Sequence, residues 1–151
     1  MRWNTILVPY DFSAGADHAA AIAISEAKLH GARVVILHVV ELTPHYGPET
    51  TLIVPDGAQT PVGIHRHARS RAEAELRELV ARLGSDVALS AVVIEGAPAD
   101  EIVRFARDHA VDAIVMGTRG RSGLRHLLAG SVAEHVVRTS PVPVLTTRQP
   151  R

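Results

Sequence analysis

The sequence predicts an α/β fold in which helices cover both faces of a five-stranded parallel sheet. Short apolar runs alternate with alanine-rich or amphipathic stretches, and these runs lack the polar alternation of a strand with one solvated face. With 151 residues, 46% of them hydrophobic, the chain has the size of one domain and enough apolar side chains to form a core. We therefore expect residues 1–151 to form a single domain.

The first half of the chain contains two predicted strands and one helix. Thr5–Pro9 (TILVP) is the first strand, and Ser13 is a suitable N-cap for an alanine-rich helix that ends near Gly31. The continuous apolar run Arg33–Val40 predicts a strand buried on both faces. Residues 41–61 contain four prolines and little periodicity, which predicts a long loop.

The second half continues the same alternation. Apolar residues at three- and four-residue spacing predict a helix from Gly63 to Leu83, which Gly84 ends. The remaining predicted elements are a strand at Val87–Ile94, a helix from Pro98, a strand at Asp112–Met116, a helix at Ser131–Arg138 and a strand at Val142–Thr147.

The composition argues against several classes of protein. Sixteen basic and sixteen acidic residues give a net charge of zero, which does not favour a nucleic-acid-binding protein or a polybasic membrane binder. Without cysteine, the chain has no disulfide, thiolate metal site or cysteine nucleophile. The apolar run before Asp11 is too short for a signal peptide, and no stretch approaches the roughly 20 apolar residues of a membrane span. We expect a cytoplasmic protein with neither a membrane nor a nucleic acid as partner.

The charges are unevenly distributed along the chain. Residues 1–116 carry ten basic and fifteen acidic residues, whereas residues 117–151 carry six arginines and only Glu134. The basic part begins with a glycine- and arginine-containing segment, Gly117–Gly123, that leaves a predicted strand. This asymmetry indicates that the last quarter of the chain binds an anion.

The same segment provides a mechanism for anion binding. Ser131 and Glu134 have the spacing of a capping box, which predicts a helix N-terminus with N–H groups and a positive dipole end directed at an anion. Glycines allow close backbone approach to a phosphate, and Arg119 and Arg121 add charge. The alternative is a plain loop before a capped helix. The dinucleotide-binding motif GxGxxG after the first strand and the P-loop motif GxxxxGK[ST] are both missing from the sequence.

The G-x2-G-x9-G-S pattern that begins at Gly117, after a strand ending in Met116, resembles the ATP-binding signature of the universal stress protein family. The segments Ile6–Ser13 and Leu37–Val40 are similar to the same family and occur in the same order. The resemblance covers the chain apart from residues 41–61. It implies a doubly wound fold with strand order 3-2-1-4-5.

The resemblance also implies the residues of a site for ATP. Pro9, Tyr10 and Asp11 would border the nucleoside, with Asp11 near the ribose or near a divalent ion, Mg²⁺ or Mn²⁺, on the phosphates. Val39 would line the adenine pocket. The loop after the fourth strand and the next helix start would surround the ribose and phosphates with Met116, Gly117, Arg119, Gly120, Arg121, Gly130, Ser131, Val132 and Ala133.

Several of these residues have alternative interpretations. Tyr10 stands where the family usually has Thr or Ser, so its ring either stacks on the nucleotide or fills part of the pocket. Asp11 alternatively satisfies backbone donors at a helix start. Ser131 is explained as a helix cap, since no adjacent His–Asp pair activates it as a phosphoryl acceptor. His38 lies inside an apolar strand and is expected to be a hydrogen-bonded core residue.

The function implied by the resemblance is that of an ATP-binding regulatory protein of the stress response, acting as a homodimer with an unidentified protein partner. Two alternatives remain open: a slow ATPase or autophosphorylating phosphotransferase, and an interaction module in which Tyr10 blocks adenine. No catalytic residue is assigned. The family dimer forms through the last strand, here Val142–Thr147. Pro141 and Pro143 mark this strand as a sheet edge because they lack N–H donors on the same side.

Overall fold

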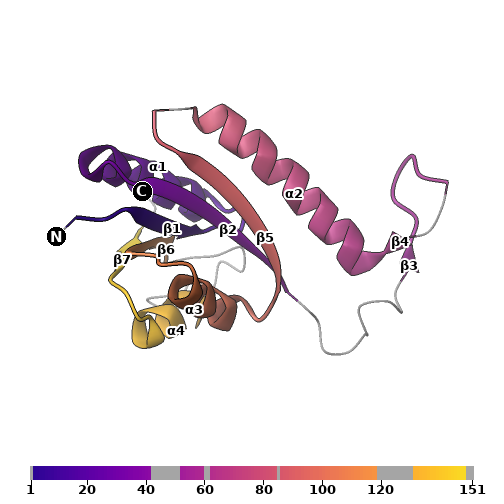
Figure 1. The fold of residues 1–151 in the computed structure, drawn as a ribbon. Helices are drawn as coiled ribbons and strands as arrows, with labels where there is room; N and C mark the ends of the chain where they lie inside the picture. Colours follow the sequence, from indigo (N-terminus) through magenta and orange to yellow (C-terminus); the bar gives the residue numbers. More distant parts are fainter. Residues whose placement is uncertain (1, 42–51, 60–61, 85, 119–130, 149–151) are drawn as a thin grey trace.

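Strands and helices alternate through most of the computed structural model, which describes residues 2–41, 52–59, 62–84, 86–118 and 131–148. In chain order (Figure 1) the elements are β1 (Thr5–Pro9), α1 (Ala14–His30), β2 (Arg33–Glu41), β3 (Leu52–Ile53), β4 (Val62–Gly63), α2 (Ile64–Leu83), β5 (Leu89–Gly96), α3 (Pro98–Asp108), β6 (Ala113–Gly117), α4 (Ser131–Thr139) and β7 (Val144–Thr147).

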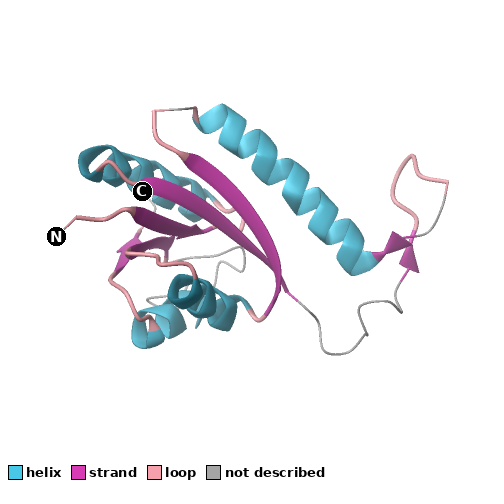
Figure 2. Ribbon diagram, in the orientation of Figure 1, coloured by secondary structure: helices cyan, strands magenta, loops and turns pink. Residues whose placement is uncertain are grey.

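The main sheet has five strands in the order β5-β2-β1-β6-β7, and every neighbouring pair is parallel. Counted along the chain within this sheet, the order is 3-2-1-4-5, which confirms the predicted topology. Figure 2 shows α1 and α2 on one face of the sheet and α3 and α4 on the other. The predicted fold class is therefore confirmed.

Three predicted helix ends are formed by the predicted residues, whereas Ser131, predicted as an N-cap, is instead the first helical residue of α4. The Ser13 Oγ accepts a hydrogen bond from the Ala16 N–H at 3.2 Å, as an N-cap does. Gly31 ends α1 in the left-handed region with φ 68°, a conformation that glycine adopts without steric cost. Pro98 begins α3, where its missing N–H is no disadvantage.

An additional hairpin and several element boundaries differ from the sequence prediction. Within and just after the predicted 41–61 loop, β3 and β4 pair as a short antiparallel hairpin; residues 42–51 and 60–61 lie outside the described part of the chain. The strand predicted from Val87 begins at Leu89. The last strand begins at Val144 rather than Val142, because Pro143 has no N–H for the ladder and contributes only its carbonyl, which accepts from the Ile114 N–H at 2.9 Å.

Two apolar clusters lie on the two faces of the sheet. Both contain residues of β1, β2 and β6; the first packs these strands against α1 and α2, and the second packs them against α3 and α4. The face of α1 that packs on the sheet consists of small residues, at most 3% exposed: Ala16, Ala19, Ala20, Ala23 and Ala27. Alanines allow the helix axis to approach the sheet closely. None of the helices in the described ranges is long and apolar enough to cross a membrane.

A carboxylate fixes the start of the central strand. The Asp112 Oδ2, just before β6, accepts hydrogen bonds from the backbone N–H groups of Asn4 at 2.7 Å and Thr5 at 2.9 Å. In return the Asp112 N–H donates to the Thr5 carbonyl at 2.9 Å. This contact joins segments more than 100 residues apart and sets the register of β1 against β6.

We expect Asp112→Ala to lower the free energy of unfolding by about 1–3 kcal/mol, because two backbone donors at the start of β1 lose their acceptor. Urea unfolding followed by circular dichroism measures the change. Asp112→Asn keeps one acceptor oxygen and should lose less than half as much. Equal losses in the two variants would show that the side-chain oxygen does not organise this end of β1.

Candidate functional site

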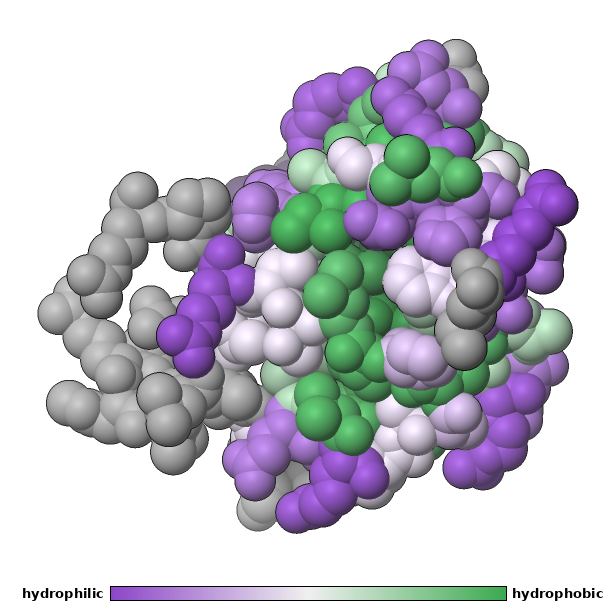
Figure 3. All heavy atoms as spheres, turned by 90° about the vertical axis from the view of Figure 1, so that its left-hand side faces the viewer, coloured by the Kyte–Doolittle hydropathy of each residue, from purple (hydrophilic) through white to green (hydrophobic). Residues whose placement is uncertain are grey.

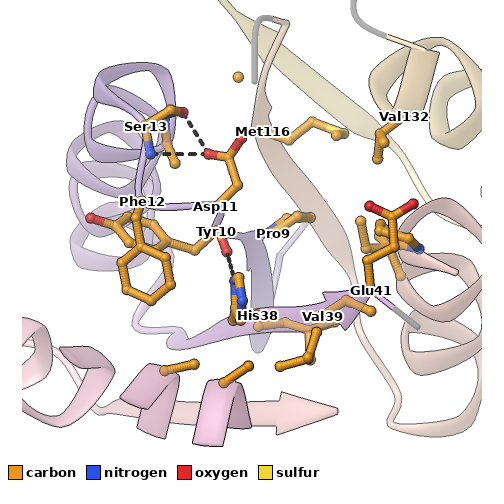
Figure 4. A pocket seen from close by; sticks show the side chains of 18 of the residues that line it. Pro9, Tyr10, Asp11, Phe12, Ser13, His38, Val39, Glu41, Met116 and Val132 are labelled. Atoms are coloured by element: carbon orange, nitrogen blue, oxygen red, sulfur yellow. Dashed lines mark hydrogen bonds between the residues drawn. The ribbon is translucent and has the colours of Figure 1, made fainter. Parts of the chain in front are cut away.

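A cavity of about 620 Å³ opens at the carboxyl ends of β1, β2 and β6. The strand order reverses between β1 and β6, which is where open α/β sheets bind ligands. Its volume is typical of a small-molecule site. Figure 4 shows side chains from β1, β2, β6 and α4 converging on this space.

Every residue predicted for the nucleotide site that the structure describes lines this one cavity. They come from the end of β1, from β2, from the end of β6 and from the start of α4: Pro9, Tyr10, Asp11, Val39, Met116, Gly117, Ser131, Val132 and Ala133. The other predicted residues, Arg119, Gly120, Arg121 and Gly130, lie outside the described residues. The structure thus brings together segments separated by more than 100 positions.

The cavity has two sides, because it extends around the carboxyl edge of the sheet. Its α3/α4 side is lined by residues of the second apolar cluster or packed on it: Leu37, Val39, Ile102, Met116, Val132 and Ala133. Its α1/α2 side is lined by residues of the first cluster or packed on it: Tyr10, Phe12, Ala16, Val40, Ala68 and Ala72. Of the predicted apolar nucleotide contacts, Val39, Met116, Val132 and Ala133 lie on the α3/α4 side.

Tyr10 is anchored in the core rather than laid across the cavity. Its side chain is buried, its hydroxyl donates to the Asp17 carboxylate on α1, and its ring meets the Phe12 ring edge-on at 5.3 Å. Burial, together with the hydrogen bond to Asp17, raises the pKa of the Tyr10 phenol above its ordinary value of 10.0. This anchoring fixes the ring on the α1/α2 side of the cavity.

The backbone after β1 is held by local hydrogen bonds. The Asp11 Oδ1 accepts from the Ser13 N–H at 3.1 Å and from the Ser13 hydroxyl at 2.5 Å. Phe12, between them, has φ 63°, a left-handed conformation that costs a bulky residue about 1–3 kcal/mol. The hydrogen bonds to Asp11 Oδ1 agree with the alternative interpretation of Asp11 as an acceptor at a helix start. Its position at the cavity agrees with the functional interpretation as well.

Gly117 packs closely against the start of α1. A Cβ atom at Gly117 would lie 3.0 Å from the carbonyl carbon and oxygen of Gly15 at the start of α1. Both contacts are backbone atoms that cannot move aside easily. The end of β6 and the start of α1 therefore lie so close together that a side chain at Gly117 would have to displace one of them.

The start of α4 supplies the polar end of the α3/α4 side. Ser131 is the first residue of α4 and is exposed, Val132 is half-buried and Ala133 is buried against the sheet. The N–H groups of a first helical turn have no acceptor within their own helix, and the dipole is positive there. The wall opposite is apolar, so the geometry suits a ligand with a flat apolar part and an anionic part.

Residues that the sequence prediction did not identify also line the cavity. They include His38 on β2 and, on α2, Ile64, His67, Ala68, Arg71 and Glu75. The His38 Nδ1 lies 2.7 Å from the Tyr10 carbonyl oxygen, so the ring is hydrogen-bonded as predicted, but it is half-buried at the cavity. Helical periodicity identified one buried face of α2, but not that its first half passes the edge of the sheet.

A divalent ion finds one predicted ligand here. Asp11 is at the cavity, and among the residues that the structure describes no group of three or more His, Cys, Asp and Glu side chains is arranged to hold a metal. Mg²⁺ is commonly held by one or two carboxylates together with substrate phosphates and water. The residues present therefore fit an ion bound chiefly through a nucleotide rather than an ion bound by the protein alone.

Comparison with known proteins identifies the family. The model of the universal stress protein family matches residues 2–148. The chain belongs to this family. A universal stress protein of Methanocaldococcus jannaschii is 33% identical over 150 residues, covering 99% of this chain and 84% of the relative. A universal stress protein of Thermus aquaticus is 36% identical over 146 residues, covering 97% of this chain and 99% of the relative.

Two similar solved structures contain nucleotides. A universal stress protein in complex with cAMP has a TM-score of 0.69 and 25% identity over 98% of each chain. The universal stress protein of Archaeoglobus fulgidus in complex with dAMP has a TM-score of 0.57 and 25% identity, covering 97% of this chain and 98% of that chain. Members of this family that share the fold therefore bind adenine nucleotides.

Tyr10→Phe should lower the free energy of unfolding at neutral pH by about 1–2 kcal/mol, because the Asp17 carboxylate loses a buried donor. The raised pKa of Tyr10 favours the protonated phenol in the folded state, so its contribution is complete below pH 10 and decreases as the pH rises above 10. Thermal unfolding from pH 8 to pH 11 measures both effects.

The second tyrosine, Tyr46, is present in both the wild type and Tyr10→Phe, so its effect on stability is the same in the two and drops out of the difference. If the wild type and Tyr10→Phe lose stability in parallel above pH 10, the Tyr10 phenol is not held in its protonated form by the fold.

Proposed function

We propose that this universal stress protein binds ATP on the α3/α4 side of the cavity and acts as a nucleotide-dependent regulatory homodimer in the stress response. The observation that carries the proposal is the convergence of all the described residues of the predicted site on one cavity at the reversal of strand order. The cAMP and dAMP complexes of similar proteins support an adenine nucleotide as the ligand.

The proposed pose follows from the two ends of the α3/α4 side. Adenine packs against Val39 and Ile102, whose side chains form an apolar wall. The phosphates approach the first turn of α4 at Ser131, where backbone donors and the helix dipole stabilise negative charge. Asp11, between these ends, contacts the ribose or a Mg²⁺ ion bound by the phosphates. Arginines predicted for the glycine loop would add to this positive end.

The proposed dimer forms through β7. This strand is one edge of the main sheet, and Leu145 on β7 and Val137 on α4 are 41% and 54% exposed. Figure 3 shows the side of the molecule on which β7 lies in Figure 1, with a band of hydrophobic surface between hydrophilic margins. An unpaired edge beside apolar surface favours association with a second copy.

The nucleotide site is tested with Ser131→Asp. An acidic residue in a first helical turn stabilises the helix, so the fold should be retained, while its charge repels phosphates. We expect the dissociation constant for Mg–ATP, measured by calorimetry on nucleotide-free protein, to rise at least tenfold.

Two controls accompany this variant. Ser131→Asn has nearly the same size without the charge and should bind within about threefold of the wild type. Ala81→Asp places the same charge on an exposed position of α2 and should bind normally. Wild-type protein that neither co-purifies with a nucleotide nor binds ATP would refute the proposed function.

The dimer is tested with Leu145→Asp. A charge on this edge strand opposes pairing with another strand, so the mass measured by light scattering should fall from about twice 16.2 kDa to 16.2 kDa. Leu29→Asp, at an 80% exposed position on α1, is the matched control and should leave the mass unchanged. A wild type that is already monomeric would disprove the β7 interface.

A further inference from the structure

The α1/α2 side of the cavity is left unused by the proposed nucleotide. Successive side chains of a strand point to opposite faces of the sheet, so Val39 faces the α3/α4 side while Val40 belongs to the first cluster on the α1/α2 side. His38 shares the orientation of Val40, and its ring lies 4.8 Å from that of Phe12. The backbone of β2 therefore separates this side from the adenine wall.

A change of residue size along α2 creates the space. Leu76 and Leu79 fill the contact between α2 and the sheet and are 0% and 4% exposed. One and two turns earlier, the same face of the helix carries Ala72 and Ala68, which line the cavity. Figure 1 shows the first half of α2 extending past the edge of the sheet toward the β3–β4 hairpin. Small side chains at this point leave an apolar floor instead of a packed core.

The rim of this floor is polar and contains a cation. His67 and Arg71 line it from α2. The Arg71 Nε donates to the Glu75 Oε1 at 2.7 Å, and the Arg71 side chain is 73% exposed. This bond uses one of the five N–H donors of a guanidinium, a group whose planar geometry matches a carboxylate. Arg71 is thus the cation of this rim that can pair with the carboxylate of a ligand, in addition to or in exchange for its bond to Glu75.

We propose that the α1/α2 side of the cavity binds a small carboxylate with an aromatic or branched apolar body, next to the nucleotide. The apolar body packs on Ala68, Ala72 and Val40, beside the rings of Phe12 and His38. The carboxylate pairs with Arg71. The site does not require the nucleotide, because no residue of the proposed phosphate or adenine contacts belongs to it.

The probe for this site is phenylacetate, titrated into nucleotide-free protein and into protein saturated with Mg–ATP. We expect saturable binding to one site in both cases, detected by calorimetry and by NMR shifts of amides in His38–Val40 and Ile64–Glu75. Acetate, which lacks the ring, and phenylethylamine, which has the opposite charge, should bind at least tenfold more weakly.

Two variants locate the probe. Ala68→Leu fills the floor, and Arg71→Gln removes the charge; each should weaken phenylacetate binding at least tenfold while ATP binding stays at the wild-type level. The matched controls are on exposed positions of the same helix, Ala74→Leu and Arg77→Gln, and should bind phenylacetate normally. If Ala68→Leu fails to fold, Arg71→Gln carries the test, because its side chain lies at the surface.

The proposal is overturned if phenylacetate does not saturate, if phenylethylamine binds as well as phenylacetate, or if the α2 variants bind like their controls. Competitive displacement of phenylacetate by ATP would also overturn it, since the two ligands would then share one side of the cavity. The outcome is separate from the proposed function: a wild type that binds phenylacetate but not ATP would support this site and refute the nucleotide site.

Discussion

The pairing of β1 on both of its edges is the constraint on which the rest of the structure depends. Ile6 is in register with Val34 of β2 and with Ala113 of β6, and Ile6, Leu7 and Val8 are fully buried. Because alternate residues of β1 point to opposite faces, one strand supplies both apolar clusters and both must be covered by helices. Crossovers between parallel strands are right-handed, so the chain covers one face by adding strands on one side of β1 and the other face by adding strands on the opposite side. The cavity lies at β1, where the strand order reverses.

The end of β1 connects the core to the candidate site through a small number of polar contacts. The Tyr10 N–H donates to the Leu37 carbonyl at 2.8 Å, its carbonyl oxygen meets the His38 Nδ1, and its hydroxyl reaches α1. Asp11 and Phe12 follow directly, held by the Ser13 cap. A strained residue and a carboxylate at a cavity are thus supported by groups that already stabilise the fold, which is how a site is kept in a fixed geometry before a ligand arrives.

The strands and most helix ends could be predicted because they depend on local signals such as the Ser13 cap, Gly31 and the apolar runs, whereas the strand order came from the resemblance to the family. The sequence did not reveal the close approach of Gly117 to Gly15, since contact between residues 15 and 117 depends on tertiary packing. The proximity of α2 to the cavity was missed for a related reason. Helical periodicity identifies a buried face, but it does not tell where along Ala68–Leu79 the underlying sheet ends. The roles of the nucleotide residues stay predictions, although their location at one cavity agrees with them.

The small residues along α1 have a consequence for how this chain can diverge. Ala16 through Ala27 approach the sheet at a distance set by methyl groups, and a larger side chain there would have to displace either the helix or β1, at a cost of about 1–3 kcal/mol. Away from Ala16, which lines the cavity, drift on this face is therefore restricted to small residues such as glycine, alanine and serine. The first half of α2 has no such restriction. Descendants of this sequence can therefore acquire new ligand preferences through α2 while α1 remains nearly constant.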